Sequence, residues 1–406
     1  MMKYIDGGVC AAMGFKAAGV HCGIRNKNTD KKDLALIVSD VMCSAAAVYT
    51  KNKVKGAPIT VTKNNIEDGK AIAVIVNSGN ANTCAPGGIE MAQWTCQLAA
   101  EAIGAQAKDI IVCSTGVIGE PLDKEPFKAG IGPVTEALSY DGGHAAAEAI
   151  MTTDTVPKEC AVEFELGGKI CRLGAIAKGS GMINPNMATM LSFITTDAAI
   201  SPEMLQKALS EDIKDTYNQI SVDGDTSTND TVAVMANGLA GNDEITEDGE
   251  DFFIFRQALN AVTTVLAKKL AADGEGASKL IECIVSGTAD KETARKISKS
   301  VISSDLLKAA MFGEDANWGR VLCAIGYTDA EFDADDIQVV MSSEKGSVKV
   351  CEHSALSPYS EEEAAVVLSA KEIQIAVHMN QGDESAAAWG CDLTYDYVQI
   401  NGDYRS

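Results

Sequence analysis

The chain has 406 residues, of which 46% are hydrophobic and 22% are charged. These fractions are typical of a folded globular protein, and they exclude a disordered or collagen-like chain. Acidic residues outnumber basic ones 57 to 34, for a net charge of −23. Such a surface repels phosphate, so neither nucleic acid nor an anionic membrane is an expected partner.

The cysteines and the hydropathy of the sequence indicate in which cellular compartment the protein is expected. Twelve cysteines lie between Cys10 and Cys391 without a CxxC pair, and no apolar stretch reaches the ~20 residues that span a bilayer. The N-terminus also lacks an apolar region of signal-peptide length. In a large chain without an export signal, we expect reduced core thiols and not disulfides or a zinc site. The sequence therefore predicts a cytoplasmic protein.

The first half of the chain alternates between strand-like and helical segments. Apolar runs of buried-strand length lie at 34–38, 71–76, 109–113 and 190–195. An Ala-rich helix is expected over about 89–103. Two β-like runs between 160 and 177 flank Gly167-Gly168 and predict a hairpin. Ser201, followed by Pro202, marks the start of a helix whose apolar face continues to Ile220.

The second half continues this mixture. Helices are predicted at about 251–272, 291–312 and 361–368. Strands are predicted at 279–286, 339–342, 348–351, 373–378 and 393–400. The order predicts a layered α/β (α+β) fold with a large domain, 1–280, and a smaller C-terminal α/β domain, 281–406.

Several familiar chemical motifs are absent from the sequence. None of the four histidines lies in HExxH or at ligand spacing from a cysteine, so each is expected to be structural or on the surface. Gly179-Ser-Gly181 is too short for a dinucleotide fingerprint. The segment 223–229 resembles a calcium loop, but it lacks the glycine at the sixth position and has Val234 where the twelfth requires Glu. A polar turn that lines a site is the expected alternative.

The Gly-rich loop 178–191 delivers Ala188-Thr189 into a strand. A loop that simply enters a strand is one interpretation, since Thr is favoured in strands. The other is that Thr189 becomes an N-terminal nucleophile. A Thr hydroxyl needs a base, and an α-amino group, with a pKa of about 7.7–8.0, could serve after cleavage of the bond before Thr189. The residues alone leave both interpretations open.

Motifs along nearly the whole chain resemble the ornithine acetyltransferase family, the bifunctional glutamate N-acetyltransferases of the arginine pathway. In chain order they are 7–9, 14–19, 77–82, 114–119, 178–191, 221–230, 273–277, 313–320 and Asn401. The chain departs from many relatives at 10–12, Ala316 and Ser406. The resemblance implies a layered α/β sandwich similar to N-terminal nucleophile hydrolases but differently connected, with self-cleavage between Ala188 and Thr189.

The resemblance also implies residue roles. Thr189 would be acylated by the acetyl group, while Thr115 and Gly116 match the pair that binds the oxyanion. The positions that match the substrate site are Thr152, Lys178, Thr189, Glu275, Asn401 and Ser406. Lys178 suits a substrate carboxylate and Glu275 a substrate ammonium. Without the resemblance, Thr115-Gly116 would be an ordinary turn, and Lys178 and Glu275 solvated surface residues.

The resemblance thus predicts an acyltransferase that moves acetyl from N2-acetylornithine to L-glutamate through acetyl-Thr189, without a metal or cofactor. Segments 1–188 and 189–406 would stay associated, with two copies of each in a heterotetramer. The family contains members that also accept acetyl-CoA and members that do not, and no residue in this sequence distinguishes the two. The alternatives are an aminopeptidase or amidohydrolase of the related self-cleaving fold, and an inactive, uncleaved homologue that binds a small molecule.

Overall fold

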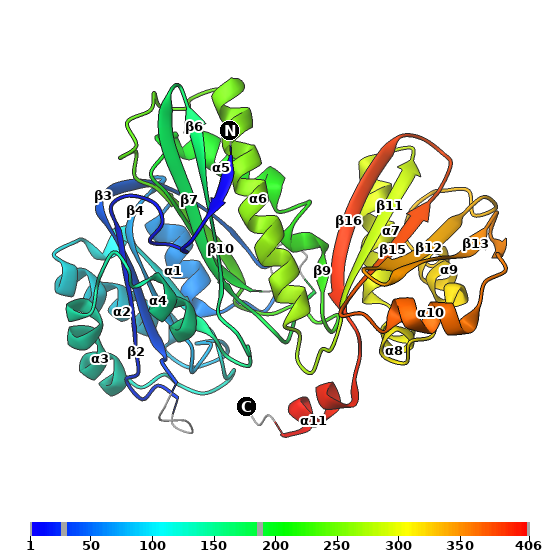
Figure 1. Ribbon diagram of the computed structural model, residues 1–406. Coiled ribbons are helices and arrows are strands. Elements are labelled where there is room, and N and C mark those ends of the chain that lie inside the picture. Colours follow the sequence, from blue (N-terminus) through cyan, green and yellow to red (C-terminus); the bar gives the residue numbers. More distant parts are fainter. Residues whose placement is uncertain (1, 26–30, 185–189, 404–406) are drawn as a thin grey trace.

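The computed structural model describes residues 2–25, 31–184 and 190–403 (Figure 1). Within these ranges, nine strands form a first sheet in the order β1-β6-β7-β8-β10-β3-β4-β5, with β2 paired to β3. The strands are β1 (Lys3–Ile5), β2 (Phe15–Val20), β3 (Leu34–Tyr49), β4 (Lys70–Asn77), β5 (Ile110–Ser114), β6 (Lys158–Leu166), β7 (Lys169–Lys178), β8 (Leu191–Thr196) and β10 (Thr231–Ala236). The predicted hairpin is β6–β7, with both turn glycines at positive φ.

Helices cover both faces of this sheet. They are α1 (Ala57–Asn65), α2 (Gly88–Ile103), α3 (Glu125–Glu136), α4 (Gly143–Ile150), α5 (Pro202–Asp212) and α6 (Glu250–Ala272). Apolar side chains of α5 and α6 share one core with β6, β7, β8 and β10, whereas α2 packs with β4 and β5. The opposite face is closed by the small side chains of α4. Strands β7, β8 and β10 therefore contribute side chains to cores on both faces of the sheet.

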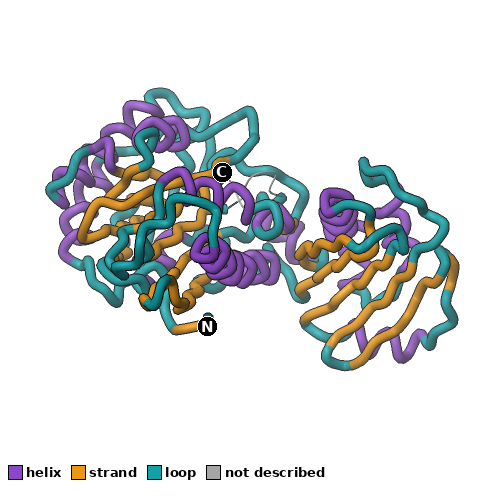
Figure 2. The backbone as a smooth tube through the Cα atoms, turned by 90° about the horizontal axis from the view of Figure 1, so that it is seen from above, coloured by secondary structure: helices purple, strands orange, loops and turns teal. Residues whose placement is uncertain are grey.

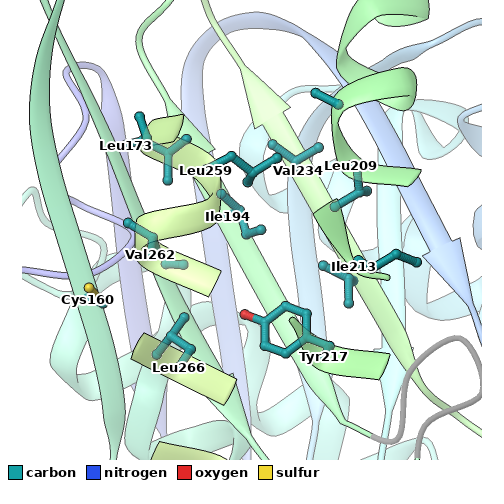
Figure 3. Close-up of a cluster of buried hydrophobic side chains, with 14 of the residues drawn as sticks. Cys160, Leu173, Ile194, Leu209, Ile213, Tyr217, Val234, Leu259, Val262 and Leu266 are labelled. Atoms are coloured by element: carbon teal, nitrogen blue, oxygen red, sulfur yellow. The ribbon is translucent and has the colours of Figure 1, made fainter. Parts of the chain in front are cut away.

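Figure 3 shows the core beneath α5 and α6. In this core the structure differs from the sequence prediction at the end of one helix. Ser201 caps α5 as predicted, since its hydroxyl accepts from the Met204 N–H at 3.3 Å. The helix ends at Asp212, however, and does not reach Ile220. Thr216, at φ −124° and ψ −97°, has left the helical conformation, and its hydroxyl donates to the Asp212 carbonyl at 3.0 Å. Tyr217 still fills the same core, and its hydroxyl lies 3.0 Å from that of Ser192.

A second sheet lies beside the first, with helices of its own (Figure 2). Seven strands of the described chain form it, in the order β14-β13-β12-β15-β11-β16-β9. They are β9 (Ile220–Ser221), β11 (Leu280–Thr288), β12 (Gln338–Ser343), β13 (Gly346–Glu352), β14 (Ala355–Leu356), β15 (Glu372–His378) and β16 (Glu384–Cys391). Strand β9 joins this sheet although it precedes β10 of the first. The division at residue 280 stays a prediction.

The helices of the second sheet include one that the sequence predicted as continuous. They are α7 (Lys291–Ser303), α8 (Asp305–Phe312), α9 (Trp318–Gly326) and α10 (Glu361–Leu368). The predicted helix 291–312 is divided at Ser304, whose hydroxyl accepts from the Leu307 N–H at 3.4 Å and starts α8. The predicted helix 361–368 is confirmed as α10.

The structure of the last described element contradicts the prediction made from the sequence. Residues 393–400 were expected as a strand, but helix α11 spans Tyr395–Asp403, and the strand is β16, just before it. Thr394 accepts from the Asp396 N–H at 3.2 Å and begins the helix. None of the α11 side chains is buried, so the alternating apolar residues there do not reflect a sheet face.

The layered α/β class that the sequence predicted is confirmed. Among the described residues, no helix combines the length and the apolar character needed to cross a membrane.

Candidate active site

One polar cavity of about 130 Å³ opens where several loops meet beside the first sheet. The described residues that the sequence singled out all line it: Thr115, Gly116, Thr152, Lys178, Glu275 and Asn401. They come from the ends of β5 and β7, from the loops after α4 and α6, and from α11. Figure 1 shows α11 leaving the second sheet and turning back beneath the first. Ala188, Thr189 and Ser406 lie outside the described residues.

The Thr115-Gly116 turn follows β5 directly. The Thr115 N–H donates to the Asn77 carbonyl at 2.9 Å, which holds the turn against β4. Gly116 has φ +128°, and a Cβ there would lie 2.5 Å from the carbonyl carbon of Gly79. Only glycine fits this backbone position. The arrangement can present a hydroxyl and a backbone N–H toward one point, as an oxyanion site requires.

Asn229 ties this turn to its neighbours. Its Nδ2 donates to the carbonyls of Ala81 at 2.5 Å and Ser114 at 2.9 Å. Its Oδ1 accepts from the hydroxyls of Thr83 at 2.5 Å and Thr228 at 2.7 Å. All four polar positions of the amide are thus used, and the carbonyl just before Thr115 is held in place. The sequence marked the segment 221–230 but assigned no role to this asparagine.

Lys178 ends β7 inside the cavity. Its Nζ donates to Thr115 Oγ1 at 3.2 Å, and the side chain is buried. Burial lowers the pKa of Lys178, while the carboxyls of Asp154 and Asp230 oppose that effect. A buried ammonium with one hydroxyl partner among the described residues is suited to hold a substrate carboxylate.

A cluster of buried charged side chains lies near Lys178. Asp154 Oδ1 accepts from Lys158 Nζ and from the Gly179 N–H, both at 2.7 Å, and Oδ2 accepts from the Thr152 N–H at 3.0 Å. Burial raises the pKa of Asp154, but Lys158 and Lys178 outweigh it and hold the value at about 2. Asp154 therefore stays ionised and orders the backbone of two segments that line the cavity. No motif in the sequence pointed to Asp154.

Glu275 and α11 form the other wall. Glu275 Oε2 accepts from Asn401 Nδ2 at 2.8 Å. A Cβ on Gly181 would lie 2.5 Å from the Glu275 carboxyl, so that glycine lets the loop pass close to it. The Thr394 hydroxyl donates to the Gly276 carbonyl at 2.6 Å and holds the start of α11. This wall offers a carboxylate for a substrate ammonium.

The acidic turn 223–229 also reaches the cavity. Asp223 accepts from the backbone N–H groups of Met182 at 2.7 Å and Ile183 at 2.8 Å. Its carboxylate oxygens are thus engaged by the chain itself, as in a polar turn. Among the described residues, no three His, Cys, Asp or Glu side chains are arranged to hold a metal ion.

The histidines lie away from the cavity. Three of them face side-chain partners elsewhere: His144 faces Glu159, His353 faces Asp336 and His378 faces Ser286. The His21 ring faces the Lys31 carbonyl. The expectation that the histidines are structural or at the surface agrees with these positions. A base for this cavity would have to come from another group.

Together, the turn, the buried lysine and the carboxylate line one cavity of an α/β protein, where a cation and an anion are both available to a small charged molecule. The ArgJ family profile matches residues 16–406. The chain therefore belongs to the ArgJ family, the acyltransferases of arginine biosynthesis, and the resemblance seen in the sequence is confirmed.

Curated relatives match from end to end. The arginine biosynthesis bifunctional protein ArgJ of Symbiobacterium thermophilum is 50% identical, and that of Caldanaerobacter subterraneus subsp. tengcongensis 48%, each over 100% of both chains. Among solved structures, the arginine biosynthesis bifunctional protein argJ from Bacillus halodurans is 47% identical with a TM-score of 0.51. That match covers 53% of this chain and 100% of the solved one.

Proposed function

We propose that this protein is a glutamate N-acetyltransferase of arginine biosynthesis, which moves acetyl from N2-acetylornithine to L-glutamate through acetyl-Thr189. The observation that carries the proposal is that Thr115, Gly116, Lys178, Glu275 and Asn401, far apart in sequence, line one cavity. Met190, the residue after Thr189, lines the same cavity. The family to which the chain belongs supports the reaction type.

The proposed chemistry has two half-reactions at one site. The Thr189 hydroxyl attacks the acetyl carbonyl of N2-acetylornithine, and the α-amino group of Thr189 accepts the hydroxyl proton. The Thr115 hydroxyl and the Gly116 N–H stabilise the tetrahedral oxyanion. Ornithine leaves, and the amine of glutamate attacks the acyl group in the second half-reaction. Both half-reactions use the same donors, because each passes through the same kind of oxyanion.

Charge complementarity supports the choice of substrate. Lys178 is a buried cation suited to an amino-acid carboxylate, and Glu275 is an anion suited to the side-chain ammonium of ornithine. Thr152 and Thr153 both line the same cavity. The predicted role of Ser406, in the same substrate site, is part of this proposal.

Maturation belongs to the proposal as well. Cleavage between Ala188 and Thr189 would release the amine that serves as base, and would leave segments of 188 and 218 residues. The solved Bacillus halodurans chain is matched over its full length while covering 53% of this chain. The second segment, 218 of 406 residues, would occupy a similar share, which supports this maturation. Assembly as a heterotetramer with two copies of each segment remains part of the proposal.

The cytoplasm is the proposed compartment. All twelve cysteines are free thiols, and most are buried. A chain that keeps this many unpaired thiols fits a reducing compartment.

The test measures both chain length and acetyl transfer. Intact mass and a denaturing gel should give two fragments for the wild type and one 406-residue chain for Thr189→Ala. Thr189→Ser keeps a hydroxyl and should still cleave. Purified protein with N2-acetylornithine should then acetylate glutamate, and acetyl-CoA in its place tests the second donor. Release of acetate without transfer would indicate a hydrolase, and an uncleaved, inactive wild type would indicate a binding protein.

A further inference from the structure

Asn229 is a buried residue of the cavity wall that has no part in the chemistry proposed above. It lies two residues before β10, it is 6% exposed, and it lines the same cavity as Thr115 and Gly116. A Cβ on Gly56 would lie 2.5 Å from its Nδ2 and 2.7 Å from its Oδ1, so a side chain at position 56 would displace the amide. Close packing therefore keeps the Asn229 amide in its place.

The hydrogen-bond partners of Asn229 also fix the orientation of the amide. The carbonyl oxygens of Ala81 and Ser114 can only accept, so they require the amide nitrogen. The amide oxygen on the other side accepts from the hydroxyls of Thr83 and Thr228. An amide rotated by half a turn would place its oxygen against two carbonyls, and the arrangement of partners is therefore specific for asparagine in this one orientation.

These hydrogen bonds reach both ends of the turn 114–117, which carries the proposed oxyanion donors. At the start of the turn, Asn229 Nδ2 donates directly to the Ser114 carbonyl at 2.9 Å. At its end, the Ala81 N–H donates to the Val117 carbonyl at 2.8 Å. The Ala81 carbonyl is in turn held by Asn229 at 2.5 Å. One amide thus holds the first residue of the turn directly and the last through Ala81.

The segment that begins with Asn229 also joins the turn to β8. The Thr231 N–H donates to the Met190 carbonyl at 3.1 Å, and Thr231 pairs with Leu191 in the parallel register of β10 and β8. The turn and the start of β8 are therefore connected through residues 229–231. Oxyanion donors act only within hydrogen-bond distance of the developing charge, and a misplacement of about 1 Å can lower a rate by about 100-fold. This connection is therefore of direct consequence for the rate.

We propose that Asn229 is a positioning residue for the acetyl transfer, because its amide holds the turn so that the Thr115 hydroxyl and the Gly116 N–H point to one place. This inference rests on the proposed function, in which these two groups stabilise the oxyanion. Asn229 acts through the turn and transfers no proton. Its loss changes turnover more than substrate binding, since the oxyanion is absent from the bound substrate.

The test is steady-state acetyl transfer from N2-acetylornithine to glutamate by Asn229→Ala, with rates taken per cleaved chain as counted by intact mass. We expect kcat to fall about 10- to 100-fold and KM to change less than about 3-fold. Asn242→Ala is the matched control. Asn242 is also buried, and its Nδ2 donates to the carbonyls of Ala199 at 3.1 Å and Asp243 at 2.8 Å, away from the cavity. Its loss should leave kcat as it is. Wild-type kcat in Asn229→Ala, or an equal fall in both variants, would overturn the proposal.

A double-mutant cycle with Thr115→Ala shows whether Asn229 acts through the turn. Once the Thr115 hydroxyl is removed, its positioning no longer affects the rate. Asn229→Ala should therefore lower kcat by a smaller factor in the Thr115→Ala background than in the wild type. Equal factors in the two backgrounds would show that the residues act independently, which contradicts the proposal.

Thr83→Val decides the matter if Asn229→Ala does not fold or does not cleave. Thr83 is buried and is not a lining residue of the cavity, and its hydroxyl donates to Asn229 Oδ1. Val has the shape of Thr without the hydroxyl, so kcat should fall about 5-fold, and Thr83→Ser should restore it. An unchanged kcat in Thr83→Val would overturn the proposal. A cleaved wild type that transfers no acetyl would instead contradict the proposed function, which keeps the two failures distinct.

Discussion

Asn401 of α11 donates a hydrogen bond from Nδ2 to Glu275 Oε2 at 2.8 Å, and this contact joins the last helix of the chain to the loop after α6. The same nitrogen donates to the Tyr397 carbonyl at 3.1 Å. Since α11 buries none of its side chains, polar contacts of this kind hold it at the cavity. The carboxylate proposed to bind an ammonium is therefore oriented by a residue more than a hundred positions away.

Asn401→Ala should weaken substrate binding. Loss of a hydrogen bond to a charged group frees the Glu275 carboxylate to rotate, and we expect KM for N2-acetylornithine to rise about 10-fold with kcat nearly unchanged. Steady-state kinetics measure both constants. Asp403→Ala, at the exposed end of the same helix, is the control and should leave KM as it is. An unchanged KM in Asn401→Ala would show that Glu275 does not need this contact.

Thr115→Ala should affect turnover more than binding. Removing one oxyanion donor typically lowers kcat by about 10²–10³-fold, and KM should change far less, because the interaction strengthens in the transition state. Thr115→Ser keeps the hydroxyl and should retain most activity. The comparison is made on fully cleaved protein, so that maturation does not enter the rate. Near-normal turnover in Thr115→Ala would remove this hydroxyl from the mechanism.

Lys158→Met should destabilise the fold. The lysine is buried and pairs with Asp154 at 2.7 Å and Asp273 at 2.6 Å, so its loss leaves two buried carboxylates without their cation. Breaking a buried pair in this way costs about 3–5 kcal/mol. Urea unfolding measures the free energy. Lys169→Met, at an exposed position of β7, is the control and should shift it by at most about 0.5 kcal/mol. A similar, small change in both variants would contradict the expectation.

Asp212 should make stability depend on pH. Burial raises its pKa from the ordinary 3.8 to about 6, against the hydrogen bonds from Asn260 and Thr263. The folded chain therefore keeps a proton that the unfolded chain loses first. This contribution to stability is fully present below about pH 4 and is lost as the pH rises through about 6.

Asp212→Asn removes this titration. The free energy of unfolding of the variant minus that of the wild type should rise between about pH 4 and 6, and level off above. The size is on the order of 1–3 kcal/mol, from the shift in pKa. Urea unfolding at several pH values measures the difference. A difference that stays constant across this range would show that Asp212 does not titrate there.

Local chemistry in the sequence was enough for several elements of the fold. Ser201 before Pro202 predicted the start of α5, and Gly167-Gly168 predicted the β6–β7 turn, because caps and positive-φ turns depend on residues a few positions apart. The alternation of apolar and polar residues in 393–400 predicted a strand, and that prediction was wrong because strand formation depends on residues far apart in the sequence. A strand needs a partner, and whether one is near is a non-local fact that the pattern does not contain.

The sequence by itself determined the family and, through its motifs, which residues to examine: Thr115, Gly116, Lys178, Glu275 and Asn401. Only the tertiary structure decided that these residues meet, and that acids such as Asp154 and Asp230 are buried among them. The physical reason is that the protonation of a carboxyl depends on its desolvation and on nearby charges. Both are fixed by segments that the fold brings together: the Gly179 N–H donates to Asp154, and the Thr231 N–H next to Asp230 donates to the Met190 carbonyl. The sequence shows where an aspartate lies in the chain, and the fold determines whether its carboxyl is ionised or protonated.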